Sequence, residues 1–340
     1  VGVRERSSLD IATRLGVPAE RICLTTDDAM YHDFPSEAPW EVPSEPYVAA
    51  TFTSHSGLVA REEYVAALGD LVRHVHESTG LEVVLIPHQA SALEGTRDGD
   101  VGIHDDIRTH AGGTGVHSLP MRPRSEAAVT RGAALVLSTR YHPVVYALGA
   151  GVPAIAFATD AYTSTKIVGA IEGMGVEILT LPAPMMLTAE ARSAFDDVWE
   201  RREPIGEGLA AANVSRRRSA SLWWDAVARA LQGQEPTAPP GLESLPQAAV
   251  GEWSASVLPL RRWADGVSGR LTSEALINVG LRAEVEELTR TTAALEAEHG
   301  ATVSSLQAEL AAHHASRAFR VLAPARRVWA ALRTRRSTRP

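Results

Sequence analysis

Short apolar runs alternate with amphipathic stretches along the first 230 residues. The apolar runs are continuous, and they predict strands at 22–25, 47–52, 82–86, 133–137, 153–158 and 176–179. The amphipathic stretches predict helices at 8–15, 61–78, 125–132, 143–149, 166–174 and 188–201. Continuous apolar strands that alternate with helices are typical of a parallel sheet covered on both faces. We therefore expect residues 1–231 to form an α/β domain with a Rossmann-like parallel sheet.

The pattern changes after residue 231. Pro and Gly predict a linker that, with a short amphipathic segment, covers 232–270, and a helical region follows at 271–316. Within this region the residues at the coiled-coil positions are Leu281, Val285, Leu288, Thr292 and Leu295, followed after Gly300 by Val303, Leu306 and Leu310. The pattern predicts either a homodimer through 281–310 or a helix folded back on its own domain. Residues 317–340 form a basic amphipathic tail.

Charge is distributed unevenly along the chain. Its 340 residues have a formal net charge of −8, yet 317–340 contain eight Arg and no Asp or Glu. The acidic body argues against a nucleic-acid partner, and the tail predicts contact with an anionic membrane surface. A disordered tail, or one docked on the acidic body, is the alternative.

The cysteine content and the apolar runs bear on the compartment. A single cysteine, Cys23, excludes a disulfide framework and favours a reduced, cytosolic protein. No apolar run reaches the roughly 18–20 residues of a spanning helix. We expect a cytoplasmic protein that lies peripherally on the inner face of the membrane.

Arg140 and His142 directly follow the predicted strand 133–137, and a predicted helix follows them. In parallel α/β sheets, ligands bind beyond the carboxyl ends of the strands, beside helix N-termini. If the segment is extended, side chains two residues apart face the same pocket. Arg suits bidentate recognition of phosphate or carboxylate, and His is a common general acid. The pair therefore predicts an anion site.

The surrounding stretch, "AAVTRGAALVLSTRYHPVVYALGAGVPAIAFATDAYTSTKIVGAIEGMGV", resembles the C-terminal part of the polysaccharide pyruvyl transferase family. That family shows an Arg-x-His pair after a strand, a helix ending in Ala and Gly, a "GVP" strand and then a Lys. The opening "VRERSSLDIATRLGV" and "ICLTTDDAM" are similar to two further family blocks, so the resemblance covers roughly residues 1–185.

The resemblance implies an activity and a scaffold. The family transfers the enolpyruvyl unit of phosphoenolpyruvate to a sugar of a surface glycopolymer as a pyruvate ketal, on a two-domain scaffold like that of GT-B glycosyltransferases. This chain would supply the second domain, with the first domain expected before Val1. The implied partners are phosphoenolpyruvate as donor and a glycan or lipid-linked saccharide as acceptor; neither a metal nor a cofactor is expected.

The resemblance also implies roles for five residues. Arg4, Arg140 and Lys166 would bind the anionic groups of the donor. His142 would protonate its vinyl carbon, and Asp27 would act as a base or orient a cation.

Each role has a structural alternative. Arg140 and His142 could form structural ion pairs, and Arg4 or its neighbour Arg6 could be a surface charge. Asp27 could cap a turn, and Lys166 could be a solvated helix residue. At the level of function, the alternatives are a GT-B glycosyltransferase that uses a nucleotide sugar, or a non-catalytic scaffold that recruits partners through its coiled coil and tail.

Overall fold

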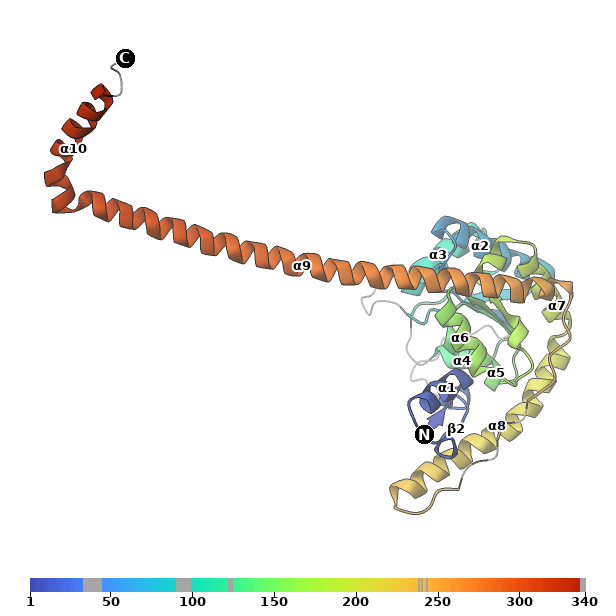
Figure 1. Cartoon of the computed structure of the whole chain (residues 1–340). Coiled ribbons are helices and arrows are strands. Elements are labelled where there is room, and N and C mark those ends of the chain that lie inside the picture. The colour runs from blue at the N-terminus through green and yellow to red at the C-terminus, as the bar shows by residue number, and fades with distance from the viewer. Residues whose placement is uncertain are drawn as a thin grey trace. The chain divides into compact units, whose positions relative to one another are not determined.

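The computed structural model describes residues 1–32, 45–89, 99–121, 125–237, 239, 241–242 and 244–336 (Figure 1). The chain divides into two compact units, Val1–Arg270 and Leu271–Pro340. The predicted functional residues all lie in the first unit.

A six-stranded parallel sheet forms the centre of the first unit. Its strands are β3 (Tyr47–Thr51), β4 (Glu82–Leu85), β5 (Val116–Ser118), β6 (Leu135–Ser138), β7 (Ala154–Ala158) and β8 (Thr180–Pro182). They are arranged in the order β5-β4-β3-β6-β7-β8, and every neighbouring pair is parallel. The predicted Rossmann-like sheet is confirmed.

Helices cover both faces of this sheet. The helices up to residue 231 are α1 (Arg6–Arg14), α2 (Arg61–Thr79), α3 (Gly99–His110), α4 (Glu126–Arg131), α5 (Tyr141–Gly149), α6 (Ala161–Ala170), α7 (Glu190–Glu200) and α8 (Arg202–Leu231). Figure 1 shows α2 and α3 on one side of the sheet and α4, α5 and α6 on the other. The strands are continuously apolar because helices bury both of their faces; all five residues of β3 and of β7, for example, are buried.

The strand order reverses between β3 and β6. From β3 the chain builds outward through β4 and β5, whereas from β6 it builds in the opposite direction through β7 and β8. Connections therefore diverge at the carboxyl ends of β3 and β6 and leave a crevice there, which is the usual ligand position in such sheets.

One predicted strand, 176–179, is wrong. Glu177–Leu179 form a 3-10 turn, and the strand β8 begins only at Thr180. The Glu177 side chain accepts a hydrogen bond from the backbone N–H of Gly173, and the N–H of Leu179 bonds to the carbonyl of Val176. These local hydrogen bonds compete with strand pairing.

The N-terminal segment, residues 1–32, adds a separate small sheet. β1 (Gly2–Val3) pairs in parallel with β2 (Cys23–Leu24), and a 3-10 turn, η2 (Asp28–Met30), follows. This turn lies against the end of α5: a Cβ atom on Gly149 would come within 2.1 Å of the Met30 carbonyl oxygen. The contact therefore depends on glycine at position 149, and it holds the N-terminal segment on the sheet domain.

Part of the segment predicted as a linker, 232–270, is attached to the surface of the domain. Backbone N–H groups of Leu245 and Ala248 donate to the carbonyls of Gly173 and Gly175, at 2.8 and 2.7 Å. The Trp253 indole donates to the Asp197 carboxylate in α7, and Val257 is fully buried. Residues 244–257 are therefore packed on the domain by hydrogen bonds that composition alone does not reveal.

Two helices follow, α9 (Val257–Ala315) and α10 (Arg317–Arg336). The helical structure predicted for 271–316 is confirmed, and the interruption at Ser316 coincides with the predicted start of the basic tail. Within the described residues, no helix has the length and apolar character needed to cross a bilayer.

Candidate functional site

A cavity of about 430 Å³ lies beyond the carboxyl ends of β3, β6 and β7. Arg140, His142 and Lys166 line it, together with His88, Glu126 and Tyr146. The side chains come from the loops after the strands and from α4, α5 and α6. This is the crevice that the reversal of strand order creates.

Arg140 stands at the junction between β6 and α5. Its backbone is extended, and it occupies the N-cap position of α5. The Ser138 hydroxyl accepts from the Arg140 N–H and donates to the Arg140 carbonyl, both at 2.9 Å. The expectation of one extended segment through His142 is wrong, because α5 begins at Tyr141. His142 lines the same cavity from the first turn of the helix. Pro143 is tolerated in this turn, because the backbone N–H that proline lacks would have no partner within the helix.

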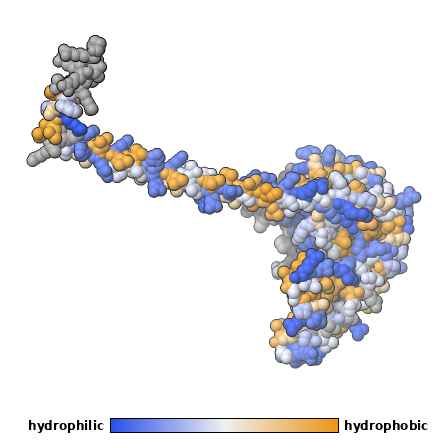
Figure 2. Space-filling model, viewed as in Figure 1, coloured by the Kyte–Doolittle hydropathy of each residue, from blue (hydrophilic) through white to orange (hydrophobic). Residues whose placement is uncertain are grey.

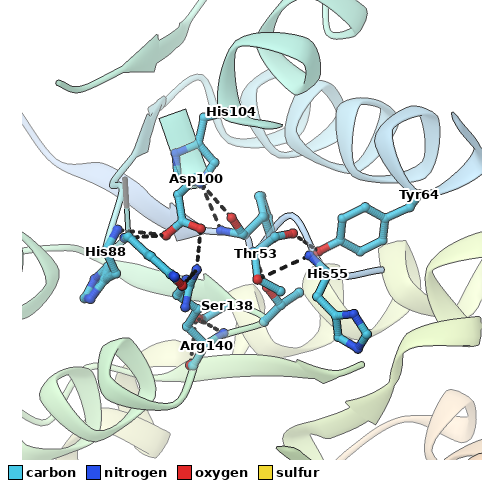
Figure 3. A network of polar contacts seen from close by, with 11 residues as sticks. Thr53, His55, Tyr64, His88, Asp100, His104, Ser138 and Arg140 are labelled. Carbon is cyan, nitrogen blue, oxygen red and sulfur yellow. Dashed lines mark hydrogen bonds and ion pairs between the residues drawn. The ribbon is translucent and has the colours of Figure 1, made fainter. Parts of the chain in front are cut away.

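The Arg140 guanidinium is held by a buried carboxylate (Figure 3). Its Nη2 atom donates to Oδ1 of Asp100 at 2.5 Å and to Gln89 at 3.1 Å. Asp100, in the first turn of α3, is fully buried, and its Oδ2 atom accepts from the N–H groups of His88 and Gln89, both at 2.9 Å. This network fixes the guanidinium between the two halves of the sheet.

Three polar atoms near the cavity lack a hydrogen-bond partner. They are Nε of Arg140, Nε2 of His88 and Oε2 of Glu126, and all three are buried from solvent. Burial lowers the pKa of His88 to about 3, with further contributions from Arg140 and His142, so its imidazole is neutral. Buried polar groups are normally hydrogen-bonded, so three orphans at one cavity indicate a place where a polar ligand would satisfy them.

Asp27 accepts three hydrogen bonds. The donors are Arg4 Nη1 at 2.8 Å, the Tyr141 hydroxyl at 2.6 Å and the N–H of Ala29 at 2.9 Å. Burial alone would raise the pKa of Asp27, but these hydrogen bonds and the Arg4 charge hold it below its usual range. Asp27 is therefore an ionised side chain that orients Arg4 and Tyr141 and caps the η2 turn.

Tyr141, which sequence reasoning missed, lies between two of the predicted cations. The Arg4 Cζ atom is 4.8 Å from its ring centroid, and Lys166 Nζ is 4.6 Å from it. Burial, with the hydrogen bond to Asp27, raises the pKa of the Tyr141 phenol. The hydroxyl therefore stays protonated and donates a hydrogen bond to Asp27.

His142 packs among aromatic rings at the mouth of the same cluster. Its imidazole contacts the Tyr141 ring edge-on at 5.2 Å and stacks on Tyr146 at 5.8 Å between centroids. Burial lowers the pKa of His142, and Lys166 and Arg4 lower it further, while Asp27 opposes the shift. In the free protein His142 is therefore a weaker base than an exposed histidine.

The charges of the site are unequally compensated. Arg140 and Arg4 are each paired with a carboxylate, Asp100 and Asp27. Lys166 forms no ion pair among the described residues, and its Nζ atom lies over the rings of Tyr141 and Tyr162. An incoming anion would thus meet one uncompensated cation and two cations already held in place.

All five predicted residues meet in one region. Arg140, His142 and Lys166 line the cavity, and Arg4 and Asp27 adjoin it behind Tyr141. Among the described residues, no group of three or more His, Cys, Asp or Glu side chains is placed to hold a metal ion.

The family comparison agrees with the resemblance seen in the sequence. Residues 1–161 match the family model described as polysaccharide pyruvyl transferase. This match confirms the predicted resemblance over those residues, which include Arg4, Asp27, Arg140 and His142. A comparison with curated proteins finds no match.

Solved structures resemble the chain only distantly. A protein described as a UDP-N-acetylglucosamine 2-epimerase from Listeria monocytogenes is 14% identical, with a TM-score of 0.46, and the match covers 71% of this chain and 61% of that one. The UDP-GlcNAc 2-epimerase from Neisseria meningitidis bound to UDP-GlcNAc is 12% identical, with a TM-score of 0.45, covering 68% and 60%. The chain thus spans about three fifths of the length of these proteins, and likenesses of this size assign no substrate.

Proposed function

We propose that this chain, through the region that matches polysaccharide pyruvyl transferases, carries the donor site of a transferase that moves the enolpyruvyl group of phosphoenolpyruvate onto a sugar of a surface glycopolymer. The observation that carries the proposal is the convergence of Arg140, His142 and Lys166 on one cavity, with Arg4 and Asp27 beside them. The five residues come from three parts of the fold, namely the N-terminal segment, the junction between β6 and α5, and the helix α6.

The charges suit a small donor with several negative groups. Phosphoenolpyruvate carries a phosphate and a carboxylate, and each needs a cation or several hydrogen-bond donors when it leaves water. Lys166 is uncompensated among the described residues, and Arg140 has a buried Nε atom without a partner. Both groups gain an interaction when an anion binds.

His142 supplies the proton in the proposed reaction. It donates to the terminal carbon of the enol, which becomes a methyl group and leaves an oxocarbenium centre at the adjacent carbon. One sugar hydroxyl forms a C–O bond to that carbon, the C–O bond to phosphate then breaks, and a second hydroxyl forms the other C–O bond. One hydroxyl proton passes to phosphate and the other restores the acid form of His142. The products are a pyruvate ketal and inorganic phosphate.

The lowered pKa of His142 fits this role when the donor is bound. In the free protein, burial and the neighbouring cations Lys166 and Arg4 lower the pKa of the imidazole and favour its neutral form. A bound phosphate and carboxylate add negative charge next to it, which raises its pKa and favours the protonated form. Donor binding would thus favour the protonated form of His142 that the reaction needs.

Donor binding tests the proposal directly. We expect titration calorimetry on this chain to detect phosphoenolpyruvate, and the variant Lys166→Met to weaken that binding. Arg192→Met, on α7 away from the cavity, is the matched control and should bind as the parent does. Binding of UDP-N-acetylglucosamine in place of phosphoenolpyruvate would instead support the nucleotide-sugar alternative and overturn the proposal.

The remaining parts of the proposal concern partners. The acceptor is a glycan or lipid-linked saccharide, and the basic segment 317–340 keeps the protein peripherally on the inner, anionic face of the membrane. We also propose that two copies of the chain form a homodimer through residues 281–310.

A further inference from the structure

Helix α9 presents an apolar stripe to solvent between Leu281 and Leu310. Figure 2 shows apolar side chains recurring along this helix. Leu281, Val285, Leu288 and Leu295 are each more than half exposed, and Val303, Leu306 and Leu310 continue the stripe. Nothing among the described residues of the second unit covers them. Exposed apolar stripes of this length are rare on monomeric surfaces.

The spacing of the stripe is that of a coiled coil with one irregularity. From Leu281 to residue 299 the seam positions alternate at intervals of four and three, with Leu at the d positions and Val285 at an a position. This choice of side chains favours two strands. From His299 to Val303 a second interval of four interrupts the alternation, next to Gly300, and the regular spacing then resumes. Such a four-residue insertion is a stutter, which locally unwinds the supercoil.

We infer that α9 pairs with α9 of a second copy as a parallel, in-register, two-stranded coiled coil through residues 281–310. The inference rests on the homodimer proposed above and specifies its arrangement. In a parallel pair the stutters of the two helices lie at the same level, so the supercoil unwinds at one place along the pair. In an antiparallel pair, the two stutters lie at the same level only if the pair is centred on residue 301. Leu281 would then lie opposite residue 321, which is beyond the interruption at Ser316.

Charge and polarity along the seam agree with the parallel arrangement. Asn278 occupies the a position one heptad before Val285, where a buried Asn pair fixes register between parallel strands. The g and e positions that meet across a parallel pair contain no like-charged combination: Ile277–Arg282, Glu284–Thr289, Thr291–Glu296, Thr302–Gln307 and Glu309–His314.

The area is sufficient for a specific interface. Seven Leu and Val side chains of the stripe, at about 90 Å² of apolar surface each, give roughly 1,200 Å² for two copies, above the roughly 1,000 Å² that specific interfaces need. A second copy of this chain supplies the same stripe with the same stutter.

Cross-linking tests the arrangement. Identical d positions face each other only in a parallel, in-register pair, with Cα atoms close enough for a disulfide. In a Cys23→Ser background, we expect Leu288→Cys to give a covalent dimer on mild oxidation. Arg290→Cys, two residues along on the outer face, is the matched control and should stay uncross-linked.

Light scattering on the whole chain separates the outcomes. We expect a dimer, which Leu288→Asp with Leu295→Asp converts to monomer while Arg290→Asp leaves it intact. A monomeric parent chain would overturn both the homodimer and its arrangement. A dimer in which Leu288→Cys fails to cross-link would overturn the parallel pairing alone. Phosphoenolpyruvate binding at the cavity is independent of all these results.

Discussion

At the scale of single residues, the Asp100–Arg140 pair decides how Arg140 can be tested. Arg140→Ala leaves the fully buried Asp100 carboxylate without its cation, and removing one partner of a buried pair typically costs about 3–5 kcal/mol. The double variant Arg140→Ala with Asp100→Asn removes both charges. We therefore predict that the single variant melts at a clearly lower temperature than the double variant.

Donor affinity distinguishes the two roles of Arg140. Both variants should bind phosphoenolpyruvate about 10- to 100-fold more weakly in calorimetry, the range for charge-assisted hydrogen bonds. Parent-like affinity in the folded double variant would show that Arg140 is a structural residue only.

The titration of His142 gives a second prediction. Lys166 lowers the pKa of His142, so Lys166→Met should raise it, and Asp27→Asn should lower it because Asp27 opposes the shift. NMR titration of the imidazole in the free protein measures both changes. If the acid form is the active one, kcat/KM should fall as pH rises through that pKa. A His142 signal that titrates identically in all three proteins would contradict the proposed electrostatic coupling.

Arg140 and His142 could be found from the sequence because the end of a buried parallel strand is a fixed place in the fold. Asp100 could not, since its closeness to Arg140 depends on a separate helix, α3, that the apolar pattern of the sequence did not predict. Tyr141 was missed for a conformational reason. An extended chain would turn it away from its neighbours, but the early start of α5 brings its hydroxyl to Asp27.

At the scale of elements, the contact between α5 and the η2 turn gives a third prediction. In Gly149→Ala the new methyl group would meet the Met30 carbonyl oxygen, and overpacking of this kind costs about 1–3 kcal/mol. We expect a lower melting temperature and faster hydrogen exchange in residues 1–32.

A matched glycine provides the control. Gly208, in α8, has no atom within 4 Å of an added Cβ, so Gly208→Ala should stabilise the helix by up to about 1 kcal/mol. Equal melting temperatures for the two variants would argue against a tight contact between α5 and η2.

Elements were predictable where their apolar pattern was long. The strands β3, β4 and β7 and the helix α2 begin and end within a few residues of the expected positions. β1 and β5, with two and three residues, are too short to show a period. The segment 244–257 looked like a linker because its attachment depends on backbone hydrogen bonds to Gly173 and Gly175.

At the scale of the whole molecule, the basic tail gives a fourth prediction. Each Lys or Arg near an anionic bilayer contributes about 1 kcal/mol, and 317–340 contain eight Arg. The chain should co-sediment with anionic vesicles at low salt and not with neutral ones. Deleting residues 317–340 should abolish sedimentation; undiminished sedimentation of the shortened chain would remove the membrane role of the tail.

The site is built from two distant parts of the sequence, and this determines the order in which it can form during synthesis. Arg4 and Asp27 leave the ribosome first, whereas Tyr141 and Lys166 follow more than a hundred residues later. Until then Asp27 lacks the Tyr141 donor, and the N-terminal segment lacks α5 to rest on. In a nascent chain that is halted before residue 141, residues 1–32 should therefore be cleaved by protease. Once the chain has emerged from the ribosome beyond Lys166, the same residues should become protected in a single step.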